Sequence, residues 1–549
     1  MAPTILQIDR RMDDLDRLVE RTRHAPLTDD EHATLKAAID TLGYVAQLLE
    51  QKGTTLAGLR HLLLGAQTEK TRDVLARVGL APPGSADAPP APTGNAADDP
   101  GAPRPTSRRQ GHGRRGADTY GGATHVAVPH AHLHHGDRCP LCLKGKVYGQ
   151  RDPRVLIRLI GQAPISGTLY DLERLRCNLC GEIFTADPPP GVGPEKYDPT
   201  TGAMIALLKY GSGMPFHRLE RLQANLQIPL PASTQWEIVE DLALTLRPVL
   251  AALMQQAANG DVVHNDDTSM TVLDLQRPGA PRGGPDDVPA DRTGVFTSGI
   301  VATRDGHRVA LFLTGRRHAG ENLARILAER TADLGPPIQM CDALSRNLPK
   351  PLAVILGHCL AHARRHIIDV AASFPAECRR ILETLSTVYR HDAEARQQDL
   401  SPEARLAHHQ TYSAPLMQDL HAWLHTQLDE HLVEPNSRLG QAITYFLTHW
   451  TPLTLFLRQP GAPLDNNIVE RSLKKAILNR KNAYFYRTAN GAHVGDLFMS
   501  LIHTCELEGV NPFAYLTALQ YHAGAMAGKP EAWLPWTYRE TLAVTVASS

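Results

Sequence analysis

The chain has 549 residues, a formal net charge of −1 and 42% hydrophobic side chains. This length exceeds what one hydrophobic core holds, so we expect several domains. The near-zero charge excludes a uniformly basic nucleic-acid-binding protein, and any basic surface must be local.

No stretch approaches the roughly 18 uninterrupted apolar residues of a membrane span. The segment Met1 to Arg17 mixes Asp and Arg and lacks the apolar core of a signal peptide. We therefore expect a soluble, cytoplasmic protein that does not bind membranes.

The N-terminal region, residues 1–80, predicts a helix that begins at a capping box. Thr28 and Glu31 form the Thr-x-x-Glu pattern. Apolar residues follow at alternating four- and three-residue steps, namely Leu35, Ile39, Leu42, Ala46 and Leu49. This run is too short to decide between a coiled coil that dimerises the chain and a helix packed in a local hairpin, so both interpretations stay open.

Residues 81–118 predict a disordered linker. The segment Ala81 to Pro105 is dominated by Pro, Ala, Gly and Asp, so it cannot bury enough surface to offset the entropy of ordering. The linker runs into a basic tract that contains Arg104, Arg108, Arg109, Arg114 and Arg115. Such a tract suits a flexible arm on DNA phosphates, although a solvated charge run has the same composition.

Residues 119–192 predict a zinc-binding module. Two Cys-x-x-Cys pairs supply four thiolates, the number that tetrahedral zinc requires; they are Cys139, Cys142, Cys177 and Cys180. Four protein ligands leave no open position, so this zinc would be structural. A redox pair would need a thioredoxin-like context, which is not evident. Nearby histidines could compete as ligands but are expected to be solvated: His130, His132, His134 and His135.

Residues 193–258 predict three helices with the spacing of a helix-turn-helix. Asp198 can cap the first helix, and Pro215 and Pro231 precede the second and third. In that arrangement the third helix would enter the major groove of DNA with its first residues near base edges. Those residues are Ser233, Thr234 and Gln235. Three ordinary packed helices would give the same pattern.

Residues 259–374 change to β-rich runs and predict the first part of an α+β core. Strands are expected at 262–273, 294–303, 307–314 and 337–342, with a hairpin turn at Asp305-Gly306. Residues 375–460 predict a helical insertion, residues 461–525 the second part of the core, and residues 526–549 a C-terminal tail.

Three acidic residues on separate elements are candidate metal ligands. Asp266 lies inside the first strand, where a charge is otherwise costly, and strand alternation lets only one of Asp266 and Asp267 face a given site. Asp342 follows an apolar run, although a turn-capping Asp would look the same. Glu470 lies on a helix whose same face carries Arg471 and Lys474.

Carboxylates that converge from separate elements suit Mg²⁺, because this hard cation takes oxygen ligands. Two divalent ions roughly 3.5–4 Å apart activate an oxygen nucleophile and stabilise charge on a phosphodiester. Such a site could cut a phosphodiester and join its ends, with cations beside Glu470 on the phosphates. Taken singly, each of the three acids could instead be a solvent-facing residue or a cap.

Several segments resemble the transposases of the insertion sequence 66 family, in the same order along the chain from about Leu59 to Leu519. The most specific are Pro463-Leu-Asp-Asn-Asn-Ile-Val-Glu-Arg-Ser-Leu, Asn479-Arg-Lys-Asn-Ala-Tyr-Phe and Gly509-Val-Asn-Pro-Phe-Ala-Tyr-Leu. Upstream, Asp266-Asp-Thr and Gly357-His-Cys-Leu-Ala-His-Ala-Arg-Arg are similar to two further family segments.

The resemblance implies a catalytic triad of Asp266, Asp342 and Glu470 on an RNase H-like core, a mixed five-stranded sheet with a helical insertion before the glutamate. The implied cofactor is Mg²⁺ or Mn²⁺. The implied activity is cleavage at transposon ends and attack of the freed 3′-hydroxyl on target DNA. The residues that would line the DNA path are His362, Arg364, Arg365, Arg471, Lys474, Arg480 and Lys481.

The implied partners are the terminal inverted repeats and the target DNA in the bacterial nucleoid, with a homodimer or higher oligomer assembled on DNA. Accessory proteins of the same element could also take part. Two alternatives stay open. One is a DNA-binding derivative that no longer cuts, and the other is a structure-specific nuclease on the same fold.

Overall fold

A computed structural model describes residues 28, 31, 32, 36, 71, 74, 126–148, 156, 162–176, 178, 180, 183–193, 195–276 and 292–548. The predicted coiled coil, the linker and the basic tract lie outside these residues, apart from isolated positions. At the predicted capping box, the Thr28 backbone N–H donates to the Glu31 carboxylate at 3.0 Å. The chain forms two compact units, one of Met1–Ser85, Pro189–Arg221 and Leu230–Ser549, the other of Ala86–Pro188 and Leu222–Pro229.

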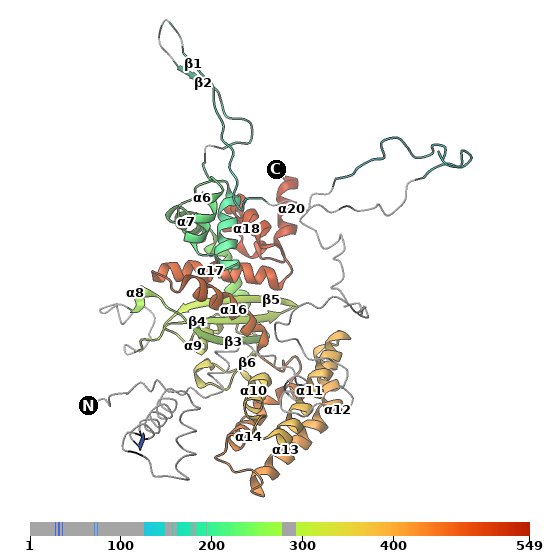
Figure 1. The fold of residues 1–549 in the computed structure, drawn as a ribbon, viewed down its shortest axis with the longest axis vertical. Helices are drawn as coiled ribbons and strands as arrows, with labels where there is room; N and C mark the ends of the chain where they lie inside the picture. The colour runs from blue at the N-terminus through green and yellow to red at the C-terminus, as the bar shows by residue number, and fades with distance from the viewer. Residues whose placement is uncertain are drawn as a thin grey trace. The chain divides into compact units, whose positions relative to one another are not determined.

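A five-stranded mixed sheet in the order β5-β4-β3-β6-β7 forms the centre of the larger unit (Figure 1). The strands are β3 (Val262–Ser269), β4 (Phe296–Arg304), β5 (His307–Gly315), β6 (Ile338–Cys341) and β7 (Ile355–His358). The first three are antiparallel, whereas β6 and β7 run parallel to β3. This confirms the predicted mixed sheet of five strands.

The predicted hairpin between β4 and β5 is also present. Asp305 and Gly306 both have positive φ angles, 51° and 81°. Two-residue hairpin turns require this conformation because their twist matches that of the strands, and Asp-Gly adopts it readily. By contrast, the first predicted strand ends at Ser269, and the short helix α8 (Leu273–Gln276) follows it.

Helices cover both faces of this sheet. On one face lies α16 (Asn467–Ala483), and on the other lies α9 (Ala319–Leu327). Helix α17 (Ala489–Leu507) lies along the edge strand β5, whose backbone N–H groups at Phe312 and Thr314 donate to Ser500 and Asp496. A Cβ at Gly299 would meet Leu473 of α16, while Ser298, its neighbour in β4, accepts a hydrogen bond from Asn322 of α9 at 2.9 Å. Adjacent strand residues point to opposite faces, so these contacts place α16 and α9 on different sides of the sheet.

The three helices predicted before the sheet are present. They are α5 (Pro199–Ala206), which continues into the π-helical turn η2 (Leu207–Gly211), α6 (Phe216–Asn225) and α7 (Ala232–Ala258). The Asp198 side chain caps α5 by accepting from the Thr200 backbone N–H at 2.9 Å. Helices after α17 complete this part of the unit: α18 (Pro512–Tyr521), α19 (Ala523–Gly528), η5 (Pro530–Trp533) and α20 (Tyr538–Ser548).

A run of helices separates α10 (Leu360–Val370) from α16, where the sequence predicts a helical insertion. They are α11 (Pro375–Gln397), α12 (Pro402–Tyr412), α13 (Ala414–Asp429), α14 (Arg438–Thr448), α15 (Trp450–Leu453) and η4 (Leu455–Leu457). Their buried side chains, among them Leu385, Leu420 and Phe446, form one hydrophobic core with Leu360 and Ile367 of α10. The insertion is therefore packed onto the helix that follows β7.

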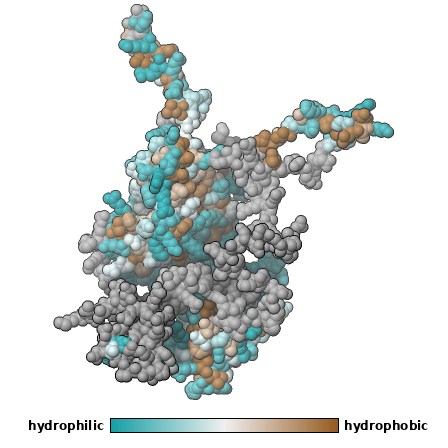
Figure 2. Space-filling model, in the orientation of Figure 1, coloured by the Kyte–Doolittle hydropathy of each residue, from teal (hydrophilic) through white to brown (hydrophobic). Residues whose placement is uncertain are grey.

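The smaller unit contains the antiparallel strands β1 (Arg174–Arg176) and β2 (Ile183–Thr185). Apolar side chains are exposed along its extended segments (Figure 2), including Val128, Leu141 and Leu169. The described residues of this unit bury little apolar surface, and a bound metal is one source of folding free energy for such a module. Across the described parts of both units, no helix has the length and apolar character that a bilayer span requires.

Candidate functional site

The two neighbouring aspartates of β3 point to opposite faces of the sheet. On one face, His264 contacts Asn466 at the start of α16, with 3.0 Å between Nδ1 and Oδ1. Asp266 lies two residues further along β3 and therefore shares this face. On the other face, the Asp267 carboxylate contacts His318 Nδ1 at 2.9 Å and Arg346 at 3.4 Å.

Asp267 is therefore part of an ion-paired cluster, and its side chain is only 2% exposed. The backbone N–H of Ala319, in the first turn of α9, also donates to it at 3.4 Å. These contacts occupy both carboxylate oxygens. The placement favours Asp266 as the candidate ligand and gives Asp267 a role in packing α9 on the sheet.

Asp342 follows β6, the parallel neighbour of β3. His264 lies opposite Met340 in this pairing, and two residues further along the strands come Asp266 and Asp342. The two carboxylates thus reach the same level of the sheet on adjacent strands. Asp342 also accepts from the Leu344 backbone N–H at 3.2 Å and from the Asn347 amide, so it caps its own turn as well.

Glu470 comes from the first turn of α16, which lies close against the sheet at the level of Asp266. Gly299 is the residue of β4 that pairs with Asp266. A Cβ there would stand 2.9 Å from Leu473 and 3.2 Å from Val469. Only glycine permits this approach, and the approach brings Glu470 over β3.

Asn466 fixes the start of α16 to the strand. Its side-chain amide donates to the Asn265 carbonyl at 3.1 Å, and its backbone N–H contacts Cys359 Sγ at 3.2 Å. Asp465 supplies the helix cap by accepting from the Asn467 backbone N–H at 3.1 Å. The local sequence gives no sign of the buried amide that joins the helix to β3.

Two residues of α10 contact Glu470. Arg365 donates to Oε2 at 2.9 Å, and His362 Nδ1 lies 3.5 Å from Oε1. Within the described residues, neither Oε1 nor His362 Nδ1 has a hydrogen-bond partner, although both atoms are buried. Cys359 Sγ completes a group whose ligand atoms all lie within 4.8 Å of one another, so this group could also hold a metal ion.

The carboxylates of Asp266, Asp342 and Glu470 lie close together in a partly buried position. Burial, followed by the charges of Asp342, Asp267 and Glu470, raises the pKa of Asp266 to about 7. Three carboxylates that repel one another in a buried position are stabilised by a divalent cation, and their oxygens are the ligands that Mg²⁺ prefers. The donor set and the unpartnered Oε1 of Glu470 therefore fit such an ion.

The predicted phosphate-contacting cations divide into two groups. Arg471, Lys474 and Lys481 are exposed on α16, and none has an ion-pair partner among the described residues. The others have protein partners: Arg364 donates to Thr71, and Arg480 donates to Ser269 Oγ at 2.7 Å. His362 and Arg365 face Glu470, as described above.

Of the three residues predicted to contact DNA in the first turn of α7, two are accessible to solvent. Ser233 is exposed and Thr234 half-buried. Gln235, in contrast, is fully buried, and its amide donates to the carbonyls of Leu230 at 2.9 Å and Phe216 at 3.2 Å. This corrects the expectation for Gln235, because a side chain that secures the turn between two helices does not reach a base. The helix-turn-helix function of these helices stays a prediction.

The first cysteine pair of the smaller unit lies on a tight turn. The Gly145 backbone N–H donates to Cys142 Sγ at 3.4 Å, and the Cys139 backbone N–H donates to the Gly145 carbonyl at 2.8 Å. Backbone N–H groups of Gly145 and Lys144 lower the pKa of the Cys142 thiol, as a metal ligand requires. Cys180 is exposed, and Cys177 lies outside the described residues. The four-cysteine zinc site stays a prediction.

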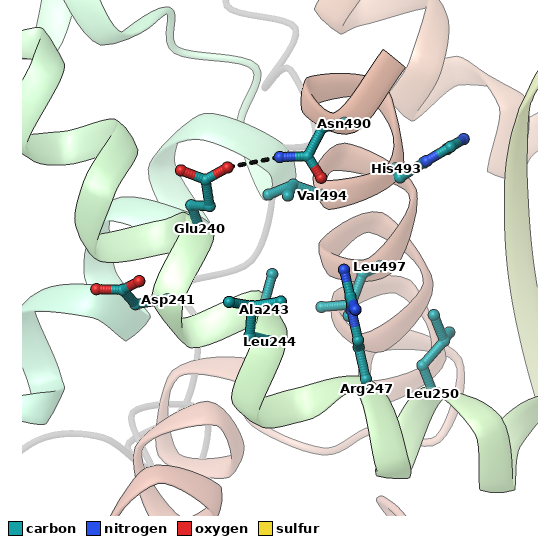
Figure 3. Close-up of a pocket in the computed structure, with 10 residues that line it drawn as sticks. All are labelled: Glu240, Asp241, Ala243, Leu244, Arg247, Leu250, Asn490, His493, Val494 and Leu497. Atoms are coloured by element: carbon teal, nitrogen blue, oxygen red, sulfur yellow. Dashed lines mark hydrogen bonds between the residues drawn. The ribbon is translucent and has the colours of Figure 1, made fainter. Parts of the chain in front are cut away.

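A separate cleft of about 480 Å³ lies between α7 and α17 (Figure 3). Its lining includes Glu240, Arg247, Asn490 and His493, and Glu240 accepts a hydrogen bond from Asn490. None of the three carboxylates lines this cleft, so the candidate chemistry belongs to the site between β3, β6 and α16.

Comparison with known proteins gives one family match, described as Transposase IS66 family, over residues 195–494, more than half of the chain. Similar proteins from Sinorhizobium fredii (strain NBRC 101917 / NGR234) are the uncharacterized proteins y4jD, y4hP and y4qI. The chain is 36% identical to y4jD over 34% of its own length and 36% of y4jD. It is 26% identical to y4hP over 68% of each chain, and 26% identical to y4qI over 61% of its own length and 62% of y4qI.

Proposed function

Because the chain belongs to the IS66 family of transposases, we propose that it binds the terminal inverted repeats of an insertion sequence, cleaves the strand ends and joins the 3′-hydroxyl to target DNA. The proposed core is RNase H-like, and the chemistry is two-metal-ion catalysis. The observation that carries the proposal is that Asp266, Asp342 and Glu470 come from three separate elements that meet: the register of β3 and β6 sets the two aspartates at one level, and α16 packs closely on β4 beside Asp266.

In this proposal Asp266, Asp342 and Glu470 hold Mg²⁺ or Mn²⁺. When bound, a pair of such ions activates the attacking oxygen and stabilises the leaving oxygen of a phosphodiester. The sheet holds the two aspartates at one level, and the close approach of α16 at Gly299 sets the position of Glu470. Such pre-positioning matters because metal-site chemistry tolerates little displacement of its ligands.

The unpaired cations of α16 support DNA as the substrate. Arg471 and Lys474 follow Glu470 on the same helix and are exposed. A strand whose phosphate lies at the carboxylates would therefore place further phosphates near these side chains, where positive charge contributes sequence-independent affinity. In the proposed protein Ser233 and Thr234 contribute base contacts, and a structural zinc at the four cysteines folds the smaller unit.

The test uses DNA that carries the element's terminal repeats, purified full-length protein and Mg²⁺. We expect strand cleavage at the repeat ends and strand-transfer products, both lost in Asp266→Asn and Glu470→Gln while DNA binding is largely retained. The control is Asp305→Asn, which changes an exposed acid in a hairpin turn that tolerates Asn. Binding without cleavage by the unsubstituted protein would indicate a DNA-binding derivative. Cleavage of branched DNA without joining would indicate a nuclease.

A further inference from the structure

The chain leaves α16 through a tight turn that exposes two adjacent aromatic rings. Tyr484 is 73% exposed and Phe485 is 44% exposed. Aromatic side chains bury large apolar areas in protein cores, so two consecutive exposed rings are costly unless they meet another molecule. They belong to the Asn479-Arg-Lys-Asn-Ala-Tyr-Phe segment, in which the family resemblance implies a role only for the two cations, Arg480 and Lys481.

The backbone at Tyr484 is strained. Its φ and ψ angles are 67° and −45°, and the Phe485 N–H donates to the Ala483 carbonyl at 2.8 Å. These values define a γ-turn with positive φ at its central residue, a form that is rare because it is strained for any residue with a side chain. Glycine would relieve that strain, so the presence of tyrosine here points to a use for its ring.

The turn is fixed to the strand that carries Asp266. The Tyr486 N–H donates to the Thr271 carbonyl at 2.9 Å, just beyond β3, and the Leu273 N–H donates back to the Tyr486 carbonyl at 3.0 Å. Arg480 adds a hydrogen bond to Ser269 Oγ at 2.7 Å. Both ends of α16 are thus attached to β3 or its continuation, so the two rings keep a fixed position relative to the carboxylates.

The spacing along α16 suits a nucleic-acid strand. From Glu470 to Tyr484 the helix rises about 20 Å at roughly 1.5 Å per residue. That distance corresponds to about six nucleotides of a stacked strand at roughly 3.4 Å each. A DNA strand that is bound at the carboxylates and extends about six nucleotides along α16 therefore reaches the two rings.

Two cations flank the two rings along the chain. Lys481 and Arg487 are exposed, and the described residues give neither of them an ion-pair partner. A protein partner would need acidic side chains opposite these cations, whereas a nucleic-acid strand carries bases and phosphates in every nucleotide. Exposed rings combined with cations are typical of surfaces that bind single strands, where bases stack on the rings and phosphates contact the cations.

We propose that Tyr484 and Phe485 form a stacking platform for unpaired bases of a DNA strand, with Lys481 and Arg487 on its phosphates. This inference rests on the proposed function for the identity of the strand, and it adds a second contact region about six nucleotides from the site of cleavage. The platform holds a strand whose bases are unpaired and does not take part in the reaction itself.

The test measures binding of a short single-stranded oligodeoxynucleotide with one internal 2-aminopurine, whose fluorescence falls when it stacks on an aromatic ring. The full-length protein is used with a chelator present, so that cleavage plays no part. We expect quenching by the unsubstituted protein, and affinity roughly tenfold weaker or worse with weaker quenching for Tyr484→Ala and Phe485→Ala. Tyr484→Trp should keep both signals.

Two variants separate the platform from a structural effect. Tyr484→Gly removes the ring and relieves the strained turn, so its thermal midpoint should be unchanged or higher while strand binding falls. Tyr412→Ala removes a similarly exposed ring, 55% exposed, from the helical insertion and should leave binding unchanged. Equal affinity of Tyr484→Gly and the unsubstituted protein would overturn the proposal. An equal loss in Tyr412→Ala would overturn it as well.

Cleavage assays on the same variants separate this inference from the proposed function. Strand binding that depends on Tyr484, in a protein that never cuts DNA, would support the platform and reject the transposase chemistry. Normal cleavage together with strand binding that ignores Tyr484 would reject the platform alone. Loss of self-association in Tyr484→Gly with intact strand binding would assign the rings to a protein contact and overturn the inference.

Discussion

Asp266 and Asp267 are adjacent acids with different surroundings, because their side chains leave opposite faces of β3. Asp267 contacts His318 at 2.9 Å and the Arg346 guanidinium at 3.4 Å. Asp266 instead faces other carboxylates, and burial together with their charge raises its pKa to about 7. A buried acid with no cationic partner among the described residues lowers the stability of the fold, which supports the proposed role of Asp266 as a metal ligand.

The raised pKa of Asp266 predicts a pH-dependent gain in stability for Asp266→Asn in metal-free buffer. Between about pH 4 and pH 7 the unfolded chain loses a proton that the folded protein keeps, so the carboxyl group destabilises the fold increasingly as pH rises. The substitution should therefore be nearly neutral at pH 4 and stabilise by roughly 2–4 kcal/mol at pH 8.

The measurement is thermal or urea unfolding of both proteins with a chelator across this pH range. Asp496 also has a pKa raised to about 7 by burial, but it is present in both proteins and cancels in the comparison. A stability difference that stays constant with pH would contradict the assigned environment of Asp266.

At the scale of the element, α16 joins the parts of the proposed site. Its first turn supplies Glu470 and packs on the sheet through Val469, its second turn packs there through Leu473, and its last turn supplies Arg480 and Lys481. The helix depends on Gly299, since no larger residue fits between it and β4. The position of Glu470 is thus a consequence of packing on the sheet.

Gly299→Ala should displace α16 from the sheet. The new Cβ would stand 2.9 Å from Leu473 and 3.2 Å from Val469, both in a buried position. We expect a loss of about 1–3 kcal/mol in unfolding free energy, as overpacking usually causes, and a larger loss of cleavage rate than of DNA affinity. The matched control is Gly315→Ala, at the end of β5, where a Cβ meets nothing within 4 Å. Equal behaviour of the two variants would show that the helix is not held in this way.

The cysteine turn of the smaller unit gives a second prediction at this scale. If zinc folds this unit, Cys142→Ser removes a ligand, so the bound zinc should be lost and the segment from Cys139 to Cys180 should become sensitive to proteolysis. Elemental analysis of the purified protein and its variant measures the zinc directly. Zinc content that is the same in both proteins would refute the site.

At the scale of the whole molecule, the sequence predicts the order of the elements well because hydrophobic periodicity and turn residues are local signals. The Asp305-Gly306 hairpin, the strands β3 to β6 and the helices between α10 and α16 follow such signals. Strand β7 lies outside the runs in which the sequence pattern predicts strands, and only the family resemblance implied a fifth strand. The candidate site is less predictable. The cluster around Asp267 and the contact between His264 and Asn466 join residues far apart in the chain.

Packing between helices also explains why the DNA contact expected of Gln235 is wrong. Gln235 occupies the position that a DNA-reading helix would use, yet it is buried because the turn before α7 needs a donor for its carbonyls. The propensity for a helix was visible in the sequence, whereas the face that the helix buries was not. Gly299 likewise carries no local signal beyond a glycine within a strand, which can mark the close approach of another backbone or side chain.

The most direct test of the central claim is anomalous diffraction from crystals of the full-length protein soaked in Mn²⁺, which takes the same oxygen ligands as Mg²⁺. We predict two manganese peaks roughly 3.5–4 Å apart, bounded by Asp266, Asp342 and Glu470. Absence of manganese from these carboxylates, or a single ion held by Cys359, His362 and Glu470 instead, would contradict the claim.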